Sequence, residues 1–205
     1  MLLIRLALVL ALTAVSGFSF AAGGPLGIDH RWNYDNTGIW KRQNQNLLQI
    51  LGAVGTASIA LSEGGESRLG HTAWQSVDST ALAALVGNGL KPVFSRERPS
   101  QTDNPNHWFS GGNHSFPSGE VSTITGVVTP YILEYRHDHP AVYALSVLPA
   151  YDAIARMKVR GHWQTDVLVG AAIGFGSGYV AHDRQSPYIL GVLPGGFAAG
   201  FKKDF

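Results

Sequence analysis

Apolar residues follow helical spacing in five successive segments of this chain, and Gly, Pro and polar residues separate the segments. Glu63-Gly64-Gly65 is a helix stop signal after the first segment, and Pro130 is expected to kink the third. The pattern predicts an all-α fold, a helical bundle of about five core helices. The expected helices span residues 47–61, 73–90, 119–134, 139–157 and 166–182.

These apolar runs are about 13–16 residues long, which is short of the roughly 20 residues that a bilayer requires. Acidic residues also lie at the ends or in the interiors of these runs, a pattern that buried helices of a bundle explain more simply than membrane-spanning helices do. Counting the N-terminal segment, however, the chain has six apolar segments, so an integral membrane protein stays open as an alternative. The acidic residues are Glu120, Glu134, Asp152 and Asp166.

The N-terminus has the pattern of a secretory signal. A short stretch with one cation, Arg5, precedes an apolar run, and Ser19-Phe20-Ala21 resembles a cleavage site. We therefore predict a signal peptide over residues 1–21 and one helical domain over residues 22–205, with an uncleaved anchor helix as the alternative. The expected location is the periplasm or the outer face of the cell membrane, or alternatively the inner membrane itself.

Composition excludes several classes of protein. The chain of 205 residues suits one domain with a substantial core. Its 15 Lys and Arg residues balance 14 Asp and Glu residues, so it has no basic field for nucleic acid. It has no cysteine, which excludes disulfides and cysteine-based zinc sites.

The tail from Ser186 mixes β-forming residues with Pro and Gly, and no element is assigned to it.

Three short motifs carry chemistry. In the first, Lys91 and Arg98 are seven residues apart, so both face one side if the helix persists through Phe94, while Pro99 should end the element. A lysine supplies a compact charge and an arginine a planar fork for phosphate oxygens. By itself this spacing suits either a phosphate site or a solvated helix end.

The second motif is a loop that leads into an apolar helical run. Ser118 can cap that helix, and Gly119 lets the backbone approach a ligand closely. Anions favour helix N-termini because free N–H groups and the helix dipole point at them. Taken alone, this motif is better explained as an ordinary N-cap without a ligand.

The third motif combines a cation with a His and an Asp. Arg156 adds a third cation, and His162 and Asp166 are four residues apart, one helical turn. Asp166 could therefore accept a hydrogen bond from one ring nitrogen and leave the other free to attack, or it could simply cap the last helix. Together, the three motifs describe a pocket for a phosphate-like oxyanion with a nucleophile beside it.

At these residues the chain resembles the type 2 phosphatidic acid phosphatase superfamily, which includes bacterial secreted acid phosphatases and vanadium haloperoxidases. The resemblance covers roughly residues 75–182 and implies a helical bundle with the pocket at its mouth. It implies His162 as the nucleophile that forms a phosphohistidine, with Asp166 orienting it, and no metal or other cofactor. It also implies that the phosphate is held by Lys91, Arg98, Ser118, Gly119 and Arg156.

Two positions depart from the family pattern. Ala155 stands where the family has Ser, and Glu120 stands where it has the His that protonates the leaving group. A carboxylic acid can donate that proton if burial raises its pKa, but the neighbouring cations oppose this shift. Glu120 is therefore either a substitute catalytic acid, which we favour, or a sign of weakened or altered catalysis.

The resulting prediction is an exported, metal-independent phosphatase for phosphomonoesters, including lipid phosphates or pyrophosphates. The expected partners are a phosphorylated small molecule or lipid phosphate and a membrane surface, with no nucleic acid. Because Glu120 replaces the usual acid, a non-catalytic phosphate or lipid-phosphate binder is the alternative, and a vanadate-dependent haloperoxidase is a third.

We interpret the Gly-rich stretch at residues 174–178 as a helix-packing surface, because no strand precedes it, whereas a nucleotide-binding loop follows a strand.

Overall fold

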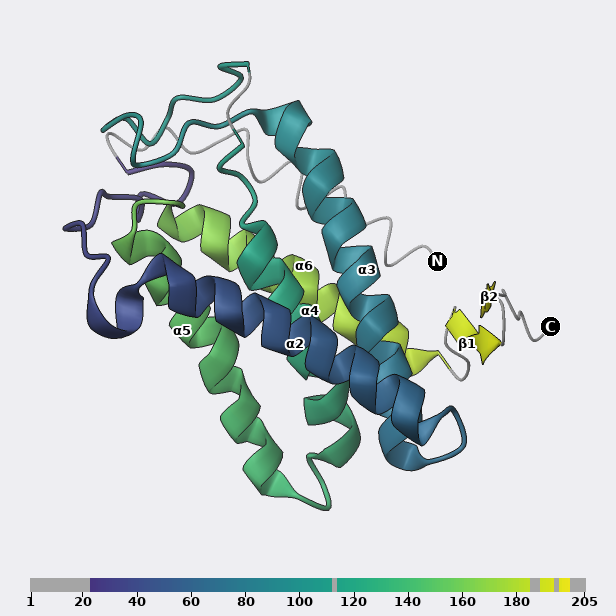
Figure 1. Cartoon of the computed structure of the whole chain (residues 1–205). Coiled ribbons are helices and arrows are strands. Elements are labelled where there is room, and N and C mark those ends of the chain that lie inside the picture. Colours follow the sequence, from purple (N-terminus) through teal and green to yellow (C-terminus); the bar gives the residue numbers. More distant parts are fainter. Residues whose placement is uncertain (1–22, 112–113, 185–188, 194–195, 200–205) are drawn as a thin grey trace.

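A computed structural model describes residues 23–111, 114–184, 189–193 and 196–199 of the chain. The predicted all-α bundle is confirmed, with five α-helices in the described residues (Figure 1). The predicted signal or anchor helix lies outside the described residues. The α-helices are α2 (Arg42–Glu63), α3 (Arg68–Phe94), α4 (Gly119–Tyr135), α5 (Val147–Lys158) and α6 (Gln164–Asp183).

Helix α4 forms the centre of the bundle and packs mainly against α6 and α3. Its apolar side chains Val121, Ile124 and Val128 are buried. The α3 hydroxyl of Ser76 donates to the Val127 carbonyl at 2.6 Å, so a polar contact also joins these two helices. The core is therefore built around the helix that follows the second motif.

Helix α6 meets α4 along a row of glycines. A Cβ atom on Gly170 would lie only 2.5 Å from the Ser118 carbonyl oxygen, and one on Gly174 or Gly178 would overlap α4 in the same way. Side chains at these positions would push the helices apart, because little space separates the two backbones. The packing interpretation of residues 174–178 is confirmed, and the glycines bring the N-termini of α4 and α6 together.

The boundaries of three predicted helices differ from the observed ones. The helix expected at 47–61 runs from Arg42 to Glu63. The helix expected at 73–90 runs from Arg68 through Pro92 to Phe94, because Ser67 caps its start and its end comes at Ser95, whose φ is 40°. The helix expected at 139–157 begins as a 3₁₀ helix, η3 (Pro140–Ser146), before α5. A second short 3₁₀ helix, η2 (Gly38–Trp40), precedes α2.

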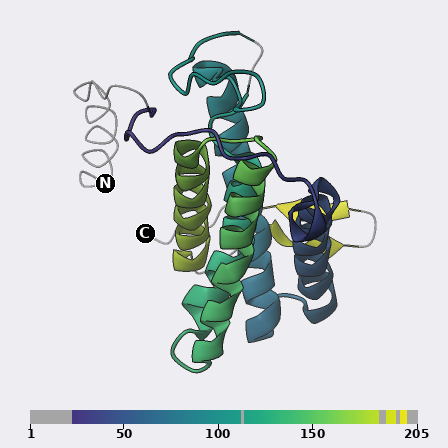
Figure 2. The ribbon, with the colours of Figure 1, turned by 90° about the vertical axis from the view of Figure 1, so that its left-hand side faces the viewer.

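The unassigned tail contains a short antiparallel hairpin of β1 (Ile189–Leu193) and β2 (Gly196–Ala199), with Leu193 opposite Gly196. The lead-in, residues 23–41 before α2, and the loop between α3 and α4 gather at one end of the bundle (Figure 2). The Asp35 amide donates to the Lys158 carbonyl, and the Ser100 amide donates to that of Arg160. This end carries the functional motifs.

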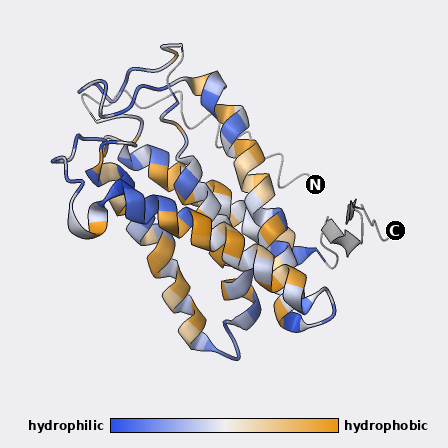
Figure 3. Cartoon of the chain, viewed as in Figure 1, coloured by the Kyte–Doolittle hydropathy of each residue, from blue (hydrophilic) through white to orange (hydrophobic). Residues whose placement is uncertain are grey.

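Helix α2 has an unusual distribution of side chains. Its middle presents apolar residues to the outside (Figure 3), while the polar Gln45 is fully buried. Further apolar side chains are exposed on α5 and α6, including Val147 and Phe175. Among the helices described, none has both the length and the apolar character needed to cross a membrane. The exposed large apolar residues of α2 are Leu47, Ile50, Leu51, Val54 and Leu61.

Candidate active site

The candidate site lies where the N-termini of α4 and α6 meet. The Ser118 amide donates to the Asp166 carbonyl at 2.9 Å, and this hydrogen bond connects the starts of the two helices. The α3–α4 loop and the lead-in close over this end of the bundle. The three sequence motifs, which span 76 positions from Lys91 to Asp166, therefore converge on one place.

His162 is buried, and its environment defines its tautomer. The Nδ1 atom lies 2.7 Å from the backbone carbonyl oxygen of Ser115. A carbonyl oxygen can only accept, so this hydrogen bond requires the proton on Nδ1 and leaves the lone pair on Nε2. Burial lowers the pKa of His162 to about 4, against the opposing effect of Asp166. At neutral pH the ring is therefore uncharged, which is the form that the predicted role as nucleophile requires.

Asp166 makes no direct hydrogen bond to the ring. Its Oδ2 lies 3.8 Å from the His162 Nδ1 atom, which is too far for a hydrogen bond but close enough for the carboxylate and the ring to interact electrostatically. Oδ2 accepts instead from the Ser115 hydroxyl at 2.5 Å and the Trp163 amide at 2.8 Å. Asp166 thus caps α6, as the alternative interpretation expected, and is connected to His162 through Ser115.

The other oxygen of Asp166 binds Arg96, a residue that the sequence analysis missed. Arg96 is fully buried, donates to Asp166 Oδ1 at 2.7 Å and to Asp29 Oδ2 at 2.6 Å, and stacks over Trp108. Arg96 and the two carboxylates are all fully buried, so the attraction between their opposite charges fixes the positions of the three side chains. Arg96 lies inside the first motif, but nothing in its spacing distinguishes it from the neighbouring cations.

Lys91 and Arg98 come together, although not on one helix as the spacing predicted. Helix α3 ends at Phe94, so Arg98 lies in the loop. Lys91 Nζ donates to the Pro117 carbonyl at 2.8 Å, and both cations reach the His114 carbonyl, at 3.3 and 3.4 Å. Burial and the charge of Arg98 lower the pKa of Lys91 to about 8.

Ser118 and Gly119 occupy the start of α4 as predicted, but Ser118 does not cap it. Its hydroxyl accepts no amide of the helix, and it is buried without a hydrogen-bond partner within the described residues. A Cβ atom on Gly119 would lie 3.6 Å from Lys91 Cε, so the turn and this lysine are in contact. The helix start therefore lies directly beside a cation of the first motif.

Arg156 is the third motif cation, and it is almost fully buried. Its Nη1 donates to Gln45 Oε1 at 3.1 Å, and its Nε lies 2.7 Å from Glu120 Oε2. Gly161 gives it room, because a Cβ atom there would overlap the guanidinium. Burial lowers the pKa of Arg156 to about 10, which still leaves it charged at neutral pH.

Glu120 is held as a carboxylate by two arginines. Arg42 Nη1 donates to Glu120 Oε2 at 2.9 Å, and Arg42 Nη2 donates to Oε1. Burial raises the pKa of Glu120, but the hydrogen bonds of Arg42 and the charge of Arg156 outweigh it, so that the pKa is lowered. The acid role of Glu120 stays a prediction, and it needs a proton that this carboxylate does not hold at neutral pH.

The side of α2 that faces the site carries Arg42, Gln45 and Gln49, at i, i+3 and i+7. Gln49 Nε2 reaches the Glu120 carbonyl at 3.4 Å and Asp152 Oδ2 at 3.3 Å. Burial and the charge of Glu120 raise the pKa of Asp152 to about 7. The helix expected from residue 47 leaves out Arg42 and Gln45, so this row was not predicted, although the polar spacing from Arg42 is visible in the sequence.

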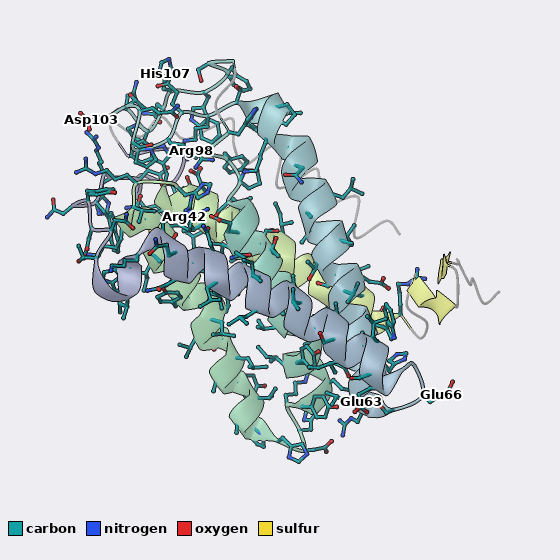
Figure 4. All side chains as sticks on the ribbon, viewed as in Figure 1. Arg42, Glu63, Glu66, Arg98, Asp103 and His107 are labelled. Carbon is teal, nitrogen blue, oxygen red and sulfur yellow. The ribbon has the colours of Figure 1, made fainter. Side chains whose placement is uncertain are left out.

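The arrangement as a whole suits an oxyanion. Arg42 and Arg98 lie at the same end of the bundle (Figure 4), and each lowers the pKa of nearby cations, including Arg156. In the described part of the chain, no three His, Asp or Glu side chains are grouped closely enough to hold a metal ion. Fixed cations beside a neutral imidazole can stabilise a phosphoryl group during attack by nitrogen.

Comparisons with known proteins agree with this chemistry. Residues 72–187 match the profile of the PAP2 superfamily, which confirms the resemblance seen in the motifs. A stretch of 101 residues is 32% identical to the lipid A 1-phosphatase of Porphyromonas gingivalis, and it covers 47% of this chain and 20% of that protein. The chain is also similar to the crystal structure of LpxE from Aquifex aeolicus, with a TM-score of 0.50 and 22% sequence identity. The matched part covers 67% of this chain and 82% of the LpxE chain, and this similarity shows a shared fold.

Proposed function

The chain belongs to the PAP2 superfamily, and from this premise we propose that it is a metal-independent phosphatase acting on phosphomonoesters of the lipid phosphate class. The observation that carries the proposal is the hydrogen bond from His162 Nδ1 to the Ser115 carbonyl. It sets the tautomer whose Nε2 can attack phosphorus. The charges of Arg156 and Arg98 act on the same ring, so the nucleophile lies among the cations that hold the phosphate.

The reaction proceeds in two steps. His162 Nε2 attacks the phosphorus, the bond to the leaving oxygen breaks, and a phosphohistidine forms. Water then attacks that phosphorus, and the electron pair of the P–N bond returns to Nε2. Lys91, Arg98 and Arg156 stabilise the equatorial oxygens in both transition states, where negative charge spreads over three oxygens.

In this proposal Glu120 exchanges protons, and its charge state decides which step it serves. As the carboxylate held by Arg42 and Arg156, it can accept the proton of the attacking water. As an acid for the leaving group, it must first take up a proton when a phosphate dianion competes for the two arginines. The acid role predicted from the sequence therefore depends on the bound state.

Several features support a lipid substrate at a membrane surface. Two relatives bear the names lipid A 1-phosphatase and LpxE. The exposed apolar residues of α2, which include Leu47, Ile50 and Leu51, would contact acyl chains favourably. Export to the periplasm or to the outer face of the membrane, expected from residues 1–21, is part of this proposal.

The test is phosphate release by the purified protein without added metal, from pH 4 to pH 8. The substrates are p-nitrophenyl phosphate and dioctanoyl phosphatidic acid, and the control is His162→Ala. We expect release from at least the aryl ester, no turnover by the variant, and retained binding of inorganic phosphate. Turnover by His162→Ala would reject the phosphohistidine mechanism.

One observation favours the second candidate, a phosphate or lipid-phosphate binder without turnover. Glu120 neutralises Arg42 and Arg156 at the position from which the family's acid acts. A protein that binds phosphate but releases none from either substrate, at any pH in the same assay, would be such a binder.

A further inference from the structure

The lead-in reaches the buried side of the candidate site through Asp29. This side chain is fully buried, although it lies outside the residues 72–187 that match the family profile. Its Oδ2 atom accepts from Arg96 Nη2 and from the Thr165 hydroxyl, both at 2.6 Å. Its Oδ1 atom accepts from the Thr165 amide at 2.8 Å. Three donors, one of them a guanidinium, therefore hold this carboxylate in a single position.

The turn before Asp29 is shaped around its carboxylate. The Asp29 amide donates to the Gly23 carbonyl at 2.5 Å, and a Cβ atom on Gly24 would overlap the carboxylate. Gly24 has a φ of 74°, which glycine adopts at little cost. The next residue, His30, exchanges two hydrogen bonds of 3.0 Å with the Gln164 side chain. The lead-in is therefore attached to the start of α6 at two consecutive residues.

The contacts of Asp29 determine where Asp166 lies. Thr165 is the second residue of α6, so its amide has no acceptor within the helix, and Asp29 supplies one. Asp166 is the third residue of α6, and its Oδ1 atom accepts from Arg96 Nη1 at 2.7 Å. The Thr165 hydroxyl accepts from the same nitrogen at 2.8 Å. Asp29 thus holds both the helix start and the guanidinium that position Asp166.

The three buried charges of this cluster do not balance. Arg96 donates through Nη2 to Asp29 and through Nη1 to Asp166, so one cation serves two carboxylates. All three side chains are fully buried. A neutral ion pair would cost less to bury than this triad, so the second carboxylate favours a role in the reaction. The excess negative charge lies beside His162, because Asp166 Oδ2 is 3.8 Å from its Nδ1 atom.

The proposed reaction places a positive charge on the ring of His162. When Nε2 bonds to phosphorus, Nδ1 keeps its proton, so the ring becomes cationic. The charges of Arg156 on α5 and Arg98 in the α3–α4 loop oppose this change, whereas Asp166 on α6 favours it. Glu120 on α4 also interacts with the ring, but its carboxylate is paired with Arg156. A negative charge on Asp166 therefore offsets the two arginines during the attack.

We propose that Asp29 is a positioning residue for the transfer of the phosphoryl group to His162. It binds one half of the Arg96 guanidinium and the start of α6, so that Asp166 stays fixed and keeps its negative charge beside the ring. With this charge in place, the bond from Nε2 to phosphorus forms more readily, and the leaving oxygen takes the electron pair of the P–O bond. This inference rests on the proposed phosphatase function and adds a residue from outside the matched segment.

The first test is Asp29→Asn, which removes the charge of the side chain and keeps its size. Arg96 is then left to Asp166 alone, so the buried cluster becomes neutral. Orthovanadate accepts a fifth bond from His162 Nε2 and so resembles the transition state, whereas the cations alone hold inorganic phosphate. We expect calorimetry to show a loss of vanadate affinity of at least about tenfold. The Kd of phosphate should change by less than about threefold, with one phosphate bound per chain.

Kinetics give a second measurement on the same variant. kcat/KM for p-nitrophenyl phosphate includes only steps up to the release of p-nitrophenolate, and it should fall by at least about tenfold in Asp29→Asn. Asp103→Asn is the matched control. It makes the same chemical change in an ion pair between the lead-in and the α3–α4 loop, but Asp103 is exposed and pairs with Arg31 (Figure 4). It should leave the affinities and kcat/KM unchanged.

A second pair of variants keeps every charge and decides the question if Asp29→Asn does not fold. Gly24→Ala displaces the Asp29 carboxylate, because the added methyl group overlaps it. Gly38→Ala is its control, because Gly38 also has a positive φ, 50°, and a Cβ atom there meets nothing within 4 Å. We expect Gly24→Ala to weaken vanadate binding at least about threefold more than phosphate binding. Gly38→Ala should change neither.

The outcomes separate this inference from the proposed function. Suppose that the wild type hydrolyses p-nitrophenyl phosphate. If Asp29→Asn and Gly24→Ala then keep the preference for vanadate, or lose vanadate and phosphate binding equally, the positioning role is overturned and the phosphatase stands. If the wild type turns over no substrate, the proposed function fails and the preference for vanadate decides. Its loss in Asp29→Asn supports the positioning role, and its absence in the wild type or its persistence in the variant overturns it.

Discussion

His162 donates through Nδ1 to the backbone carbonyl of Ser115 at 2.7 Å, while the hydroxyl of the same serine donates to Asp166 at 2.5 Å. One residue therefore connects the imidazole to the buried carboxylate, which lies 3.8 Å from the ring. The acceptor that sets the histidine tautomer is a main-chain atom, so no side-chain substitution at Ser115 removes it.

This relationship predicts different effects for two substitutions. Ser115→Ala keeps the carbonyl and loses only the bond to Asp166, so kcat/KM should fall less than tenfold. Asp166→Asn should lower kcat/KM more than a hundredfold and destabilise the fold by about 3 kcal/mol, because the buried Arg96 loses one of its two carboxylates. Steady-state kinetics and urea unfolding measure both effects. Equal losses in the two variants would show that the hydroxyl bond to Asp166, and not the Ser115 carbonyl, is the contact on which His162 depends.

Glu120→Gln should tighten the binding of inorganic phosphate. The carboxylate of Glu120 competes with phosphate for Arg42 and Arg156, and an amide carries no charge to compete. We expect a decrease in Kd of roughly tenfold, measured by calorimetry at low salt. Arg136→Gln, which changes an exposed cation at the far end of α4, serves as the control. Weaker binding in Glu120→Gln would show that the carboxylate is not a competitor.

The same variant tests the acid role predicted from the sequence. If Glu120 protonates the leaving group, Glu120→Gln should lose activity on alkyl phosphates at least a hundredfold and retain most activity on aryl esters, whose oxygens leave without a proton. Parallel assays with n-decyl phosphate and p-nitrophenyl phosphate measure this. Equal losses on the two substrates would reject the acid role.

Lys91 should impose an alkaline limit on activity. Its pKa is lowered to about 8, and only the charged amine binds phosphate, so binding is present below this pH and lost as the pH rises through it. p-Nitrophenyl phosphate is a dianion throughout this range, because the second pKa of a phosphate ester is about 6. kcat/KM should fall up to tenfold per pH unit above about 8, and Lys91→Arg should move this limit upward. A flat profile to pH 10 would contradict the assignment.

Asp152 should make stability depend on pH. It faces Glu120 on α4, Arg156 on α5, and Arg42 and Gln49 on α2, and its pKa in the folded protein is raised to about 7. Its contribution to stability is therefore full below its unfolded pKa of about 4 and lost as the pH rises through about 7.

Asp152→Asn should therefore stabilise the fold more at pH 8 than at pH 5, by roughly 2–3 kcal/mol in the free energy of unfolding. Urea titrations at the two pH values measure this difference. Asp138→Asn is a matched control, because Asp138 is exposed and pairs with Arg68 at the other end of the bundle. The same stabilisation at both pH values would show that Asp152 is ionised throughout.

Local chemistry explains which parts of the site were predictable. The spacing of His162 and Asp166 and the small residues Ser118 and Gly119 lie next to helix starts, and helix starts follow from nearby residues. The sequence also predicted that Lys91 and Arg98 lie close together, but it did not predict that a loop, rather than the helix, brings them together. The helix ends at Phe94, and a loop brings the arginine back.

Contacts between distant segments could not be predicted in the same way. Arg42 meets Glu120 across 78 positions, and Asp29 meets Arg96 across 67. Neither pair has a spacing that marks it, because such contacts depend on how whole helices pack. In the sequence, Asp152 is only an acidic break in an apolar run, yet packing buries it beside Glu120 and raises its pKa.

The sequence by itself determined the helical class, the seam of glycines on α6 and the identity of the motif residues, since each depends on residues within a few turns of one another. The tertiary structure decided that Ser115 sets the tautomer of His162, that Arg96 holds Asp166, and that Glu120 is a carboxylate between Arg42 and Arg156. The physical reason is that charge states and hydrogen-bond partners depend on burial and on neighbours from other helices, which appear only when the bundle is assembled.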